Sequence, residues 1–219
     1  MTFLPHARPQ LRNVVGLLTG TANGLAEPFI APALHTERLI LRPYLRSDEA
    51  DWLRIEHDET IRTGLGWPTR TPHEARVHLH SRTLHTTLQY PGDFLVLAIE
   101  HDHHVIGDVS LHLRTAAPET RMVEIGWLLL SSESGSGFAT EAAQALLGVA
   151  FCDLRSMVVA AVTRQDNISS SRLAARLGFH LAGSTSEHTT FLLTASRWQS
   201  SHETARGTHD DNIWDTGQQ

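Results

Sequence analysis

Cysteine is almost absent from this chain, because Cys152 is the only one among its 219 residues. One cysteine excludes an internal disulfide framework and is compatible with a reducing compartment, so we expect a cytoplasmic protein. Cys152 follows an apolar helical stripe, and we therefore expect its thiol to be buried and to serve packing rather than chemistry.

Long apolar runs are missing as well. No stretch approaches the roughly 20 residues that cross a bilayer, so the sequence predicts no membrane partner. Near the N-terminus, Arg8 and Arg12 precede five apolar-type residues (14–18), which is shorter than the apolar core of a signal peptide, at least about seven residues. We therefore expect no secretion.

Positive charge is scarce and dispersed. The net charge is −6 with histidine neutral, and no arginine-rich run occurs. Nucleic-acid binding depends on neutralising phosphates, so nucleic acid is not expected as the main partner. A mildly acidic surface instead favours a cationic partner such as an amine or a basic peptide. The histidine-rich segment 101–104 lies at a predicted hairpin tip, where side chains diverge, so we expect no metal site.

The composition is that of a globular protein with one core: 41% of the residues are hydrophobic, 19% are charged, and the mean hydropathy is −0.20. Proline and glycine punctuate residues 1–34, which we interpret as an irregular N-terminal extension. This extension would pack on the domain or exchange with a neighbouring copy to give a homodimer. Residues 35–198 form the predicted domain, and residues 199–219 a polar, mobile C-terminal tail.

Hydrophobic periodicity and breakers predict the elements along the chain. Strands are expected over 36–43, 94–99, 105–111, 122–130 and 157–162, with a final β pair between 179 and 194. Helices are expected from Ser47, from Thr71 to about Thr87, over 139–151, and over 169–177 with Gly178 as the closing residue. This order implies an α/β sandwich on one mixed sheet, with a parallel crossover over 122–162.

The stretch 122–151 is the most informative part of the sequence, and the other predicted elements are arranged around it. An aliphatic strand is followed by a loop with two glycines and two serines (Ser134-Gly135-Ser136-Gly137), and a helix opens at once. Unpaired amides and the helix dipole add at such a junction, which favours a phosphate or diphosphate ligand. From this motif alone, an ordinary tight turn without a ligand is as good an interpretation as a phosphate site.

Four segments resemble one family when taken together. They are the first strand Thr36-Glu37-Arg38-Leu39-Ile40-Leu41-Arg42-Pro43, the strand Glu124-Ile125-Gly126-Trp127, the loop 134–142, and Asn167-Ile168-Ser169-Ser170-Ser171-Arg172 followed by Leu177-Gly178-Phe179. In this order they resemble the GNAT N-acetyltransferase superfamily, and most closely its RimJ/RimL-type ribosomal-protein branch. The resemblance covers residues 35–198 and implies a mixed, mostly antiparallel sheet of six to seven strands flanked by about four helices.

The resemblance also implies an activity, namely acetyl transfer from acetyl-CoA to a primary amine by direct attack in a ternary complex. The amine would belong to a protein N-terminus or to a small molecule, and no metal is involved. The residues that would contact acetyl-CoA are Leu128, Leu129, Leu130, Ser134, Gly135, Ser136, Gly137, Phe138, Ala139, Thr140, Asn167 and Arg172.

Two departures from the family pattern concern the loop and the last helix. Ser134 stands where the family usually has Arg or Gln, and Ser136 replaces a usual Lys, Arg or Gln, so a charge-assisted contact with the diphosphate is missing. Ala174 stands where many members place a tyrosine. A non-catalytic sensor or scaffold that binds acyl-CoA is therefore the alternative function.

Glu124 is the candidate general base, because an acidic residue in an aliphatic strand faces either a cavity or solvent. Ser170 matches the signature serine that would protonate the leaving thiolate, and plain helix capping is the competing role. The resemblance places Trp67 in the acceptor cleft, and Trp127 is a second candidate there, although aromatic side chains more often belong to the core.

Overall fold

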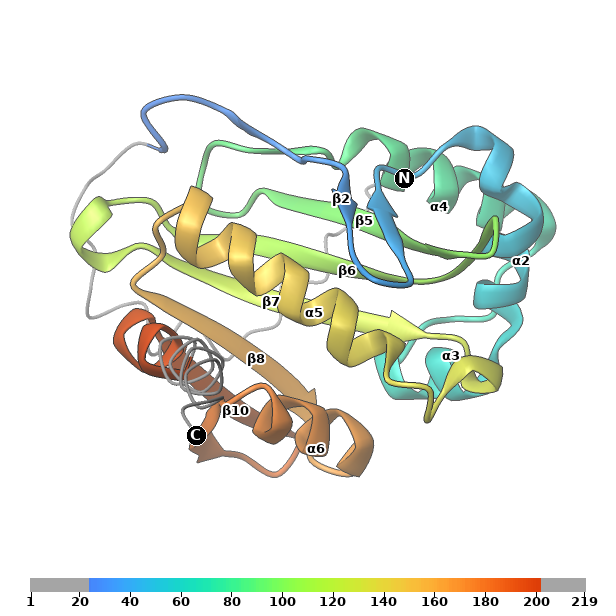
Figure 1. Cartoon of the computed structure of the whole chain (residues 1–219). Helices are drawn as coiled ribbons and strands as arrows, with labels where there is room; N and C mark the ends of the chain where they lie inside the picture. The colour runs from blue at the N-terminus through green and yellow to red at the C-terminus, as the bar shows by residue number, and fades with distance from the viewer. Residues whose placement is uncertain (1–23, 202–219) are drawn as a thin grey trace, which may run out of the picture.

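The computed structural model describes residues 24–201, which form an eight-stranded sheet with helices on both faces (Figure 1). The strands are β1 (Phe29–Ile30), β2 (Leu34–His35), β3 (Ile40–Arg42), β4 (Thr87–Leu88), β5 (Phe94–His101), β6 (His104–Thr115), β7 (Met122–Leu129), β8 (Val158–Arg164), β9 (His180–Ser184) and β10 (His188–Thr194). The α-helices are α2 (Glu49–His57), α3 (Glu59–Leu65), α4 (Pro72–Leu84), α5 (Phe138–Gly148) and α6 (Ile168–Arg176).

The large sheet has the order β2-β3-β5-β6-β7-β8-β10-β9, and β1 pairs with β4 in a separate two-stranded sheet. Every neighbouring pair in the large sheet is antiparallel except β7 and β8, which are parallel. The predicted mixed, mostly antiparallel α/β architecture is therefore confirmed. The sheet has one strand more than the predicted six to seven.

Each face of the sheet has its own core. α5 crosses one face, where Leu146 and Leu147 pack with the odd-numbered β7 residues Val123 and Ile125. α2, α3 and α4 cover the opposite face, where Trp52, Ile55 and Leu79 pack with Leu128 and Leu130. Because strand side chains alternate between faces, the residues of β7 divide between these two environments.

The segment predicted as one strand over 36–43 contains the turn of a hairpin: residues 40–42 form β3 as expected, but the prediction was wrong for residues 36–39, which form the turn between β2 and β3. The Thr36 hydroxyl accepts a hydrogen bond from the Leu39 N–H at 3.0 Å, and the Thr36 N–H donates to the Leu39 carbonyl at 3.0 Å. This threonine turn separates β2 from β3. Of the predicted extension 1–34, residues 24–34 are described and supply β1 and the first residue of β2; residues 1–23 lie outside the described part.

Two helix ends also differ from prediction. α4 begins with the expected capping box between Thr71 and Glu74 but ends at Leu84, because Thr87 pairs with Ile30 in the β1–β4 sheet. α5 continues as a π-helix over Val149–Asp153. The wider π turn rotates the side chains out of the α-helical phase, and Cys152 is exposed rather than buried.

The C-terminal end of the described chain is helical. Residues 195–201 are helical, and Trp198 stacks on Phe151 with ring centroids 5.2 Å apart. The predicted polar tail therefore begins inside a helix, and residues 202–219 lie outside the described part. None of the helices in residues 24–201 is long and apolar enough to cross a membrane.

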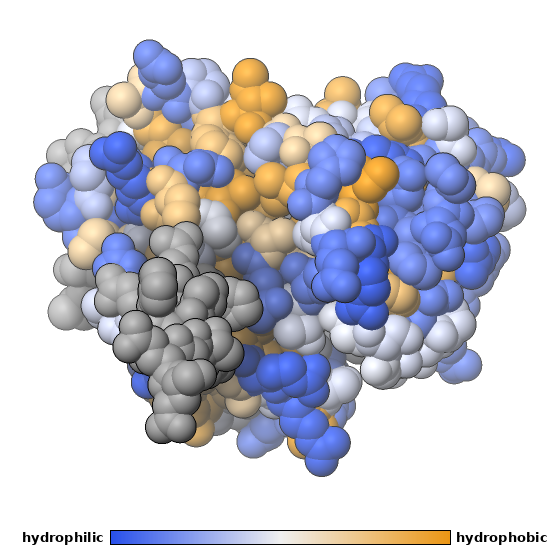
Figure 2. Space-filling model, in the orientation of Figure 1, coloured by the Kyte–Doolittle hydropathy of each residue, from blue (hydrophilic) through white to orange (hydrophobic). Residues whose placement is uncertain are grey.

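Hydropathy is unevenly spread over the face seen in Figure 2, where hydrophilic side chains dominate over α2 and α3 and apolar ones are more frequent toward β2 and the segment before it. Exposed large apolar side chains include Ile30, which is 70% exposed, and Leu84, which is 67% exposed. Ile30 belongs to β1, and Leu84 is the last residue of α4, before β4.

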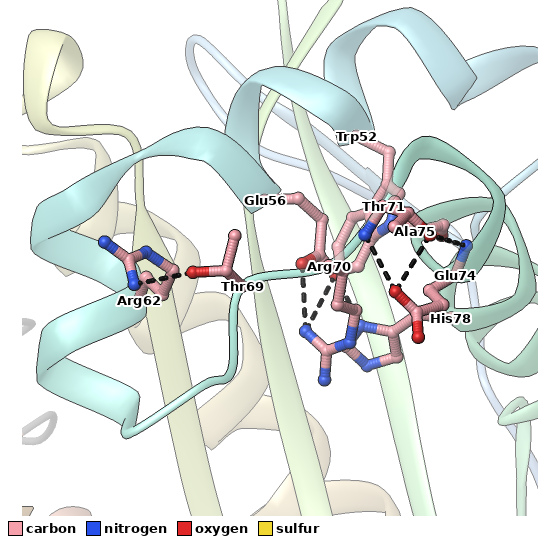
Figure 3. A network of polar contacts seen from close by, with 9 residues as sticks. All are labelled: Trp52, Glu56, Arg62, Thr69, Arg70, Thr71, Glu74, Ala75 and His78. Atoms are coloured by element: carbon pink, nitrogen blue, oxygen red, sulfur yellow. Dashed lines mark hydrogen bonds and ion pairs between the residues drawn. The ribbon is translucent and has the colours of Figure 1, made fainter.

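A buried polar cluster ties α2 to α4 and the loop before α4 (Figure 3). The Glu56 carboxylate, 2% exposed, contacts Nδ1 of His78 at 2.5 Å and Nη1 of Arg70 at 2.9 Å. The Trp52 indole N–H donates to the Ala75 carbonyl at 2.9 Å. Burial alone would raise the pKa of Glu56, but the bonds from His78 and Arg70 outweigh it and hold the pKa below its ordinary value of 4.5.

We expect stability to fall on acidification in two stages. Burial lowers the pKa of His78 and of His85 below 6.5, so the unfolded state binds their protons first and stability declines as the pH falls below about 6.5. The lowered pKa values of Glu56, Asp58 and Glu141 give a second, steeper decline below about 4.5. Urea unfolding at pH 7.5, 6 and 4 measures both stages. Glu56→Gln should reduce the second slope, and a flat profile from pH 7.5 to 4 would contradict the assignment.

Candidate active site

The sheet opens between its two parallel strands. β7 and β8 are paired from Met122–Val158 to Ile125–Ala161, and no pairing between them continues beyond this point in the described chain. On its other side β7 stays paired with β6 as far as Leu129, and the Leu130 N–H donates to the Ile106 carbonyl at 2.8 Å. The edge of β7 from Gly126 to Leu130 that faces β8 therefore presents its peptide groups without a strand partner.

The loop after β7 leads into the N-terminus of α5. Gly135 and Gly137 both have positive φ values, 90° and 85°, a region that favours glycine. The N–H groups of residues 135–140 have no hydrogen-bond acceptor in the described part of the chain. Side chains cap α3, α4 and α6, namely Asp58, Thr71 and Asn167, whereas no side chain caps α5.

Six consecutive amides without acceptors at a helix N-terminus make a binding site for an anion. A side chain at Gly135 would meet nothing within 4 Å, so the loop surface there is open. These residues fit the diphosphate of a coenzyme A thioester. The donors would be the backbone N–H groups of the predicted residues Gly135, Ser136, Gly137, Phe138, Ala139 and Thr140.

Side chains from the β2–β3 turn form hydrogen bonds that hold this loop and the first turn of α5 in place. Nη1 of Arg38 donates to the Ser136 carbonyl at 2.9 Å, and Nε of Arg38 donates to the Glu141 carboxylate at 2.7 Å. The same carboxylate accepts from the Thr36 hydroxyl at 2.6 Å. Burial opposes ionisation of Glu141, but these bonds outweigh it and lower its pKa. Glu141 is therefore ionised and balanced by Arg38, so it does not repel an anion at the helix N-terminus.

Glu124 lies on the face of the sheet that α2–α4 cover and is 5% exposed. Nη2 of Arg114, from β6, lies 2.8 Å from Oε2 of Glu124. His112 is the cross-strand partner of Glu124, and its Nε2 lies 3.2 Å from the Ser110 hydroxyl. A Cβ at Gly126 would lie 2.7 Å from that hydroxyl, so glycine makes room for Ser110 where β7 and β8 separate.

His112 also belongs to a ring stack. Its ring lies 5.0 Å from that of Phe94, which lies 3.8 Å from that of His85. The stack fixes the orientation of His112 beside Glu124. A carboxylate, an imidazole and a hydroxyl therefore meet at the opening of the sheet.

Ser170 and Asn167 lie on the other face, at the start of α6. The Asn167 side chain accepts from the Ser170 N–H at 3.0 Å, which is the predicted capping role. The Trp127 indole N–H donates to the Ser170 hydroxyl at 3.2 Å. The hydroxyl thus accepts from Trp127, and its own proton is oriented away from the indole.

Several other residues predicted to contact acetyl-CoA have side chains that are buried in the core, or a backbone N–H that is already hydrogen-bonded within the loop. Leu128 and Leu130 are buried in the core under α2–α4, so only their backbone could reach a ligand, and Leu129 is partly buried on the opposite face. The Phe138 ring is 7% exposed and packs against His101 and Arg38. Ser134 donates its N–H to the Ser131 carbonyl, which uses one loop amide.

The two tryptophans proposed for the acceptor cleft are on different faces. Trp67 packs with Trp52 and His78, at ring distances of 6.0 and 5.1 Å, within the cluster under α2–α4. Trp127 packs against the α5 core and contacts Ser170. Trp67 therefore shares the face of Glu124, whereas Trp127 lies with Ser170, the predicted proton donor.

The sequence alone did not point to Arg38, Ser110, His112, Arg114 or Arg176, which border the site. Alternation along β6 would have placed Ser110, His112 and Arg114 on one face, but the pairing that brings this face to Glu124 is not visible in a single strand. Among residues 24–201, no three His, Cys, Asp or Glu side chains gather so that they could hold a metal ion.

An opened parallel strand pair lies beside an uncapped, glycine-bearing helix start, a combination that favours an anionic ligand. The sequence model for the acetyltransferase (GNAT) domain matches residues 38–180, more than half of the chain. The chain therefore belongs to the GNAT acetyltransferase family. It is 27% identical over 153 residues to the uncharacterized N-acetyltransferase YoaA of Bacillus subtilis (strain 168), covering 69% of this chain and 85% of that protein.

Solved structures of acetyltransferases share the fold. An acetyltransferase from Agrobacterium tumefaciens strain C58 is similar with a TM-score of 0.57 and 26% identity, over 75% of this chain and 95% of that one. RimL, a ribosomal L7/L12 alpha-N-protein acetyltransferase solved with coenzyme A, is similar with a TM-score of 0.60 and 20% identity, over 76% of this chain and 98% of that one.

Proposed function

We propose that this chain is an acetyl-CoA-dependent N-acetyltransferase of the RimJ/RimL-like type, which acetylates a primary amine by direct attack in a ternary complex. The observation that carries the proposal is the run of six loop and helix amides without acceptors beside the open edge of β7. Family membership supports the reaction class, and the Asn167–Arg172 and Glu124–Trp127 segments support the branch. The acceptor would be a protein N-terminus or a small-molecule amine.

The thioester supplies an activated acetyl group when acetyl-CoA is bound. The amides of residues 135–140 hold the diphosphate, and the peptide groups of residues 128–130 bind the pantetheine arm in the manner of a strand. Asn167 and Arg172, at the start and middle of α6, would make further contacts with that cofactor.

Two side chains, on opposite faces of the sheet where β7 and β8 separate, transfer protons: one accepts a proton and the other donates one. Glu124 accepts the proton that the attacking amine must lose, next to the His112 imidazole. Ser170, whose oxygen accepts from Trp127, would donate its hydroxyl proton to the departing sulfur, directly or through water, and regain a proton from solvent. The two residues thus act on different faces of the sheet.

Calorimetric titration with acetyl-CoA, followed by a thiol-release assay over a panel of amines, tests the proposal. We expect 1:1 binding and thiol release with at least one primary amine. All 18 basic Lys+Arg residues are arginines, so the chain has no lysine to accept acetyl groups in competition. Absence of binding would contradict the proposal. Binding without release on any acceptor would favour the acyl-CoA sensor, which the serines at 134 and 136 also allow.

A further inference from the structure

The diphosphate loop lacks a cation of its own. Ser134 and Ser136 are uncharged, and the guanidinium nearest to the loop, that of Arg38, is paired with Glu141 at 2.7 Å. Backbone amides alone provide partial charges, whereas ionised donors make shorter and stronger bonds to phosphate. An additional cation close to the first turn of α5 would complete the site.

Arg176 occupies that position. It is the last residue of α6, which lies beside the N-terminal end of α5 (Figure 1). Its Nη1 donates to the Thr140 hydroxyl, in the first turn of α5, at 3.1 Å. No carboxylate of the described chain lies within 4 Å of Arg176, in contrast to Arg38.

A guanidinium at the N-terminus of a helix is electrostatically misplaced, because the dipole of α5 is positive there. Arg176 would stabilise the C-terminal end of its own helix if it stayed over α6, but its bond to Thr140 directs it to α5. The arrangement is favourable once a dianion lies between the guanidinium and the loop amides.

Arg172 strengthens this argument. It precedes Arg176 by four residues on α6, is exposed, and has no ion pair in the part of the chain that the structure describes. Like charges four residues apart on a helix repel each other, so the arginine-bearing face of α6 gains stability from a bound anion.

The direction of α6 agrees with the path of the cofactor. Ser170, near its start, contacts Trp127 of β7, and Arg176, six residues or about 9 Å further on, contacts Thr140. The helix therefore runs from the opening of the sheet to the loop.

Resting on the proposed function, we propose that Arg176 binds the diphosphate of coenzyme A and provides the cationic contact that Ser134 and Ser136 cannot make. Arg172 adds to the same positive field. The ligand class is a nucleoside diphosphate attached to a pantetheine arm.

Titration calorimetry with CoA and with 3′-dephospho-CoA tests this proposal on the full chain. Arg176→Gln should weaken binding of both ligands by about tenfold, because both carry the diphosphate. Arg54→Gln, the same change at an exposed arginine of α2, should leave both affinities unchanged. Ser134→Arg combined with Arg176→Gln should restore most of the lost affinity.

The outcomes separate the inference from the proposed function. If wild-type protein binds CoA and Arg176→Gln binds it equally well, the inference is overturned and the proposed function stands. A loss seen with CoA but not with dephospho-CoA would assign Arg176 to the 3′-phosphate and overturn the diphosphate contact. Failure of wild-type protein to bind CoA would overturn the proposed function and the inference together. Arg176→Lys and melting temperatures show whether a loss reflects charge or folding.

Discussion

Replacing Glu124 with glutamine is expected to lower turnover by about 100-fold while leaving the affinity for CoA within about twofold, because general acid–base catalysis contributes at least this much. Glutamine keeps the volume of the buried side chain and a hydrogen-bonding oxygen for Arg114. It cannot accept a proton from the amine. Single-turnover rates and CoA titrations on the same preparation measure the two quantities.

The size of the effect should depend on the acceptor. At pH 7 an alkylamine with a pKa of about 10.4 is neutral roughly once in 2,500 molecules, whereas an α-amine near pKa 8 is neutral about once in ten. Loss of the base should therefore harm an alkylamine acceptor more than an N-terminal one.

Two further variants show whether Glu124 acts directly. Glu119→Gln makes the same change at an exposed residue and should have no effect. Arg114→Gln keeps the carboxylate and removes its partner, so it should lower turnover far less than Glu124→Gln. Equal losses in Arg114→Gln and Glu124→Gln would mean that the pair only holds β6 to β7, and unchanged turnover in Glu124→Gln would remove the residue from the mechanism.

The local parts of the fold followed from the sequence. The capping box at Thr71, the cap at Asn167 and the left-handed glycine at 178 are decided by interactions within a few residues, and the structure contains all three. The apolar runs of β7 and β8 likewise led to a parallel pair. Their pattern is strong because both faces of these strands are covered.

Two predictions were wrong because they depended on features that local sequence patterns do not show. The turn at Thr36 is stabilised by a hydrogen bond from the Thr36 hydroxyl to Glu141, 105 residues away. The alternation of apolar and polar residues alone had predicted a single strand there. Cys152 is exposed because one π turn changes the phase of the helix, and no composition signal marks that turn.

The residues of the candidate site likewise fall into those that the sequence identified and those that only the structure reveals. Glu124 was chosen because it is an acidic residue in an aliphatic strand, and Asn167 and Ser170 were identified by resemblance; the roles of all three stay predictions. Arg114 and Arg176 reach the site from a neighbouring strand and from the far end of a helix, so only the register and the packing of α6 on α5 reveal them.

Arg82→Met is expected to destabilise the fold by about 3–5 kcal/mol, the cost of leaving a buried charge without its partner. Nη1 of Arg82, on α4, lies 2.7 Å from Oδ2 of Asp108, which is 3% exposed, and the Tyr44 hydroxyl donates to the same oxygen at 3.0 Å. Methionine keeps the packing against the Trp52 ring, over which the guanidinium lies at 4.9 Å. Urea unfolding at pH 7 measures the change.

The pH dependence of this variant should be opposite in sign to the acid lability of the wild type. Burial raises the pKa of Asp108 above 3.8, and Arg82 and Tyr44 counteract that rise. Without Arg82 the pKa rises further, so the unfolded state binds fewer protons than the folded state and stability falls as the pH increases above about 4. Arg82→Met should therefore lose more stability at pH 8 than at pH 5.

A second substitution separates charge from packing. Arg82→Met with Asp108→Leu removes both charges and should recover most of the loss, since replacing a buried pair by apolar side chains is often neutral. Arg76→Met, at an exposed arginine of the same helix whose partner Glu49 is also exposed, should cost less than about 1 kcal/mol. If the double variant were as unstable as Arg82→Met, or if Arg82→Met were equally stable at pH 5 and pH 8, the stability of α4 on the sheet would depend on the shape of the arginine side chain and not on its charge.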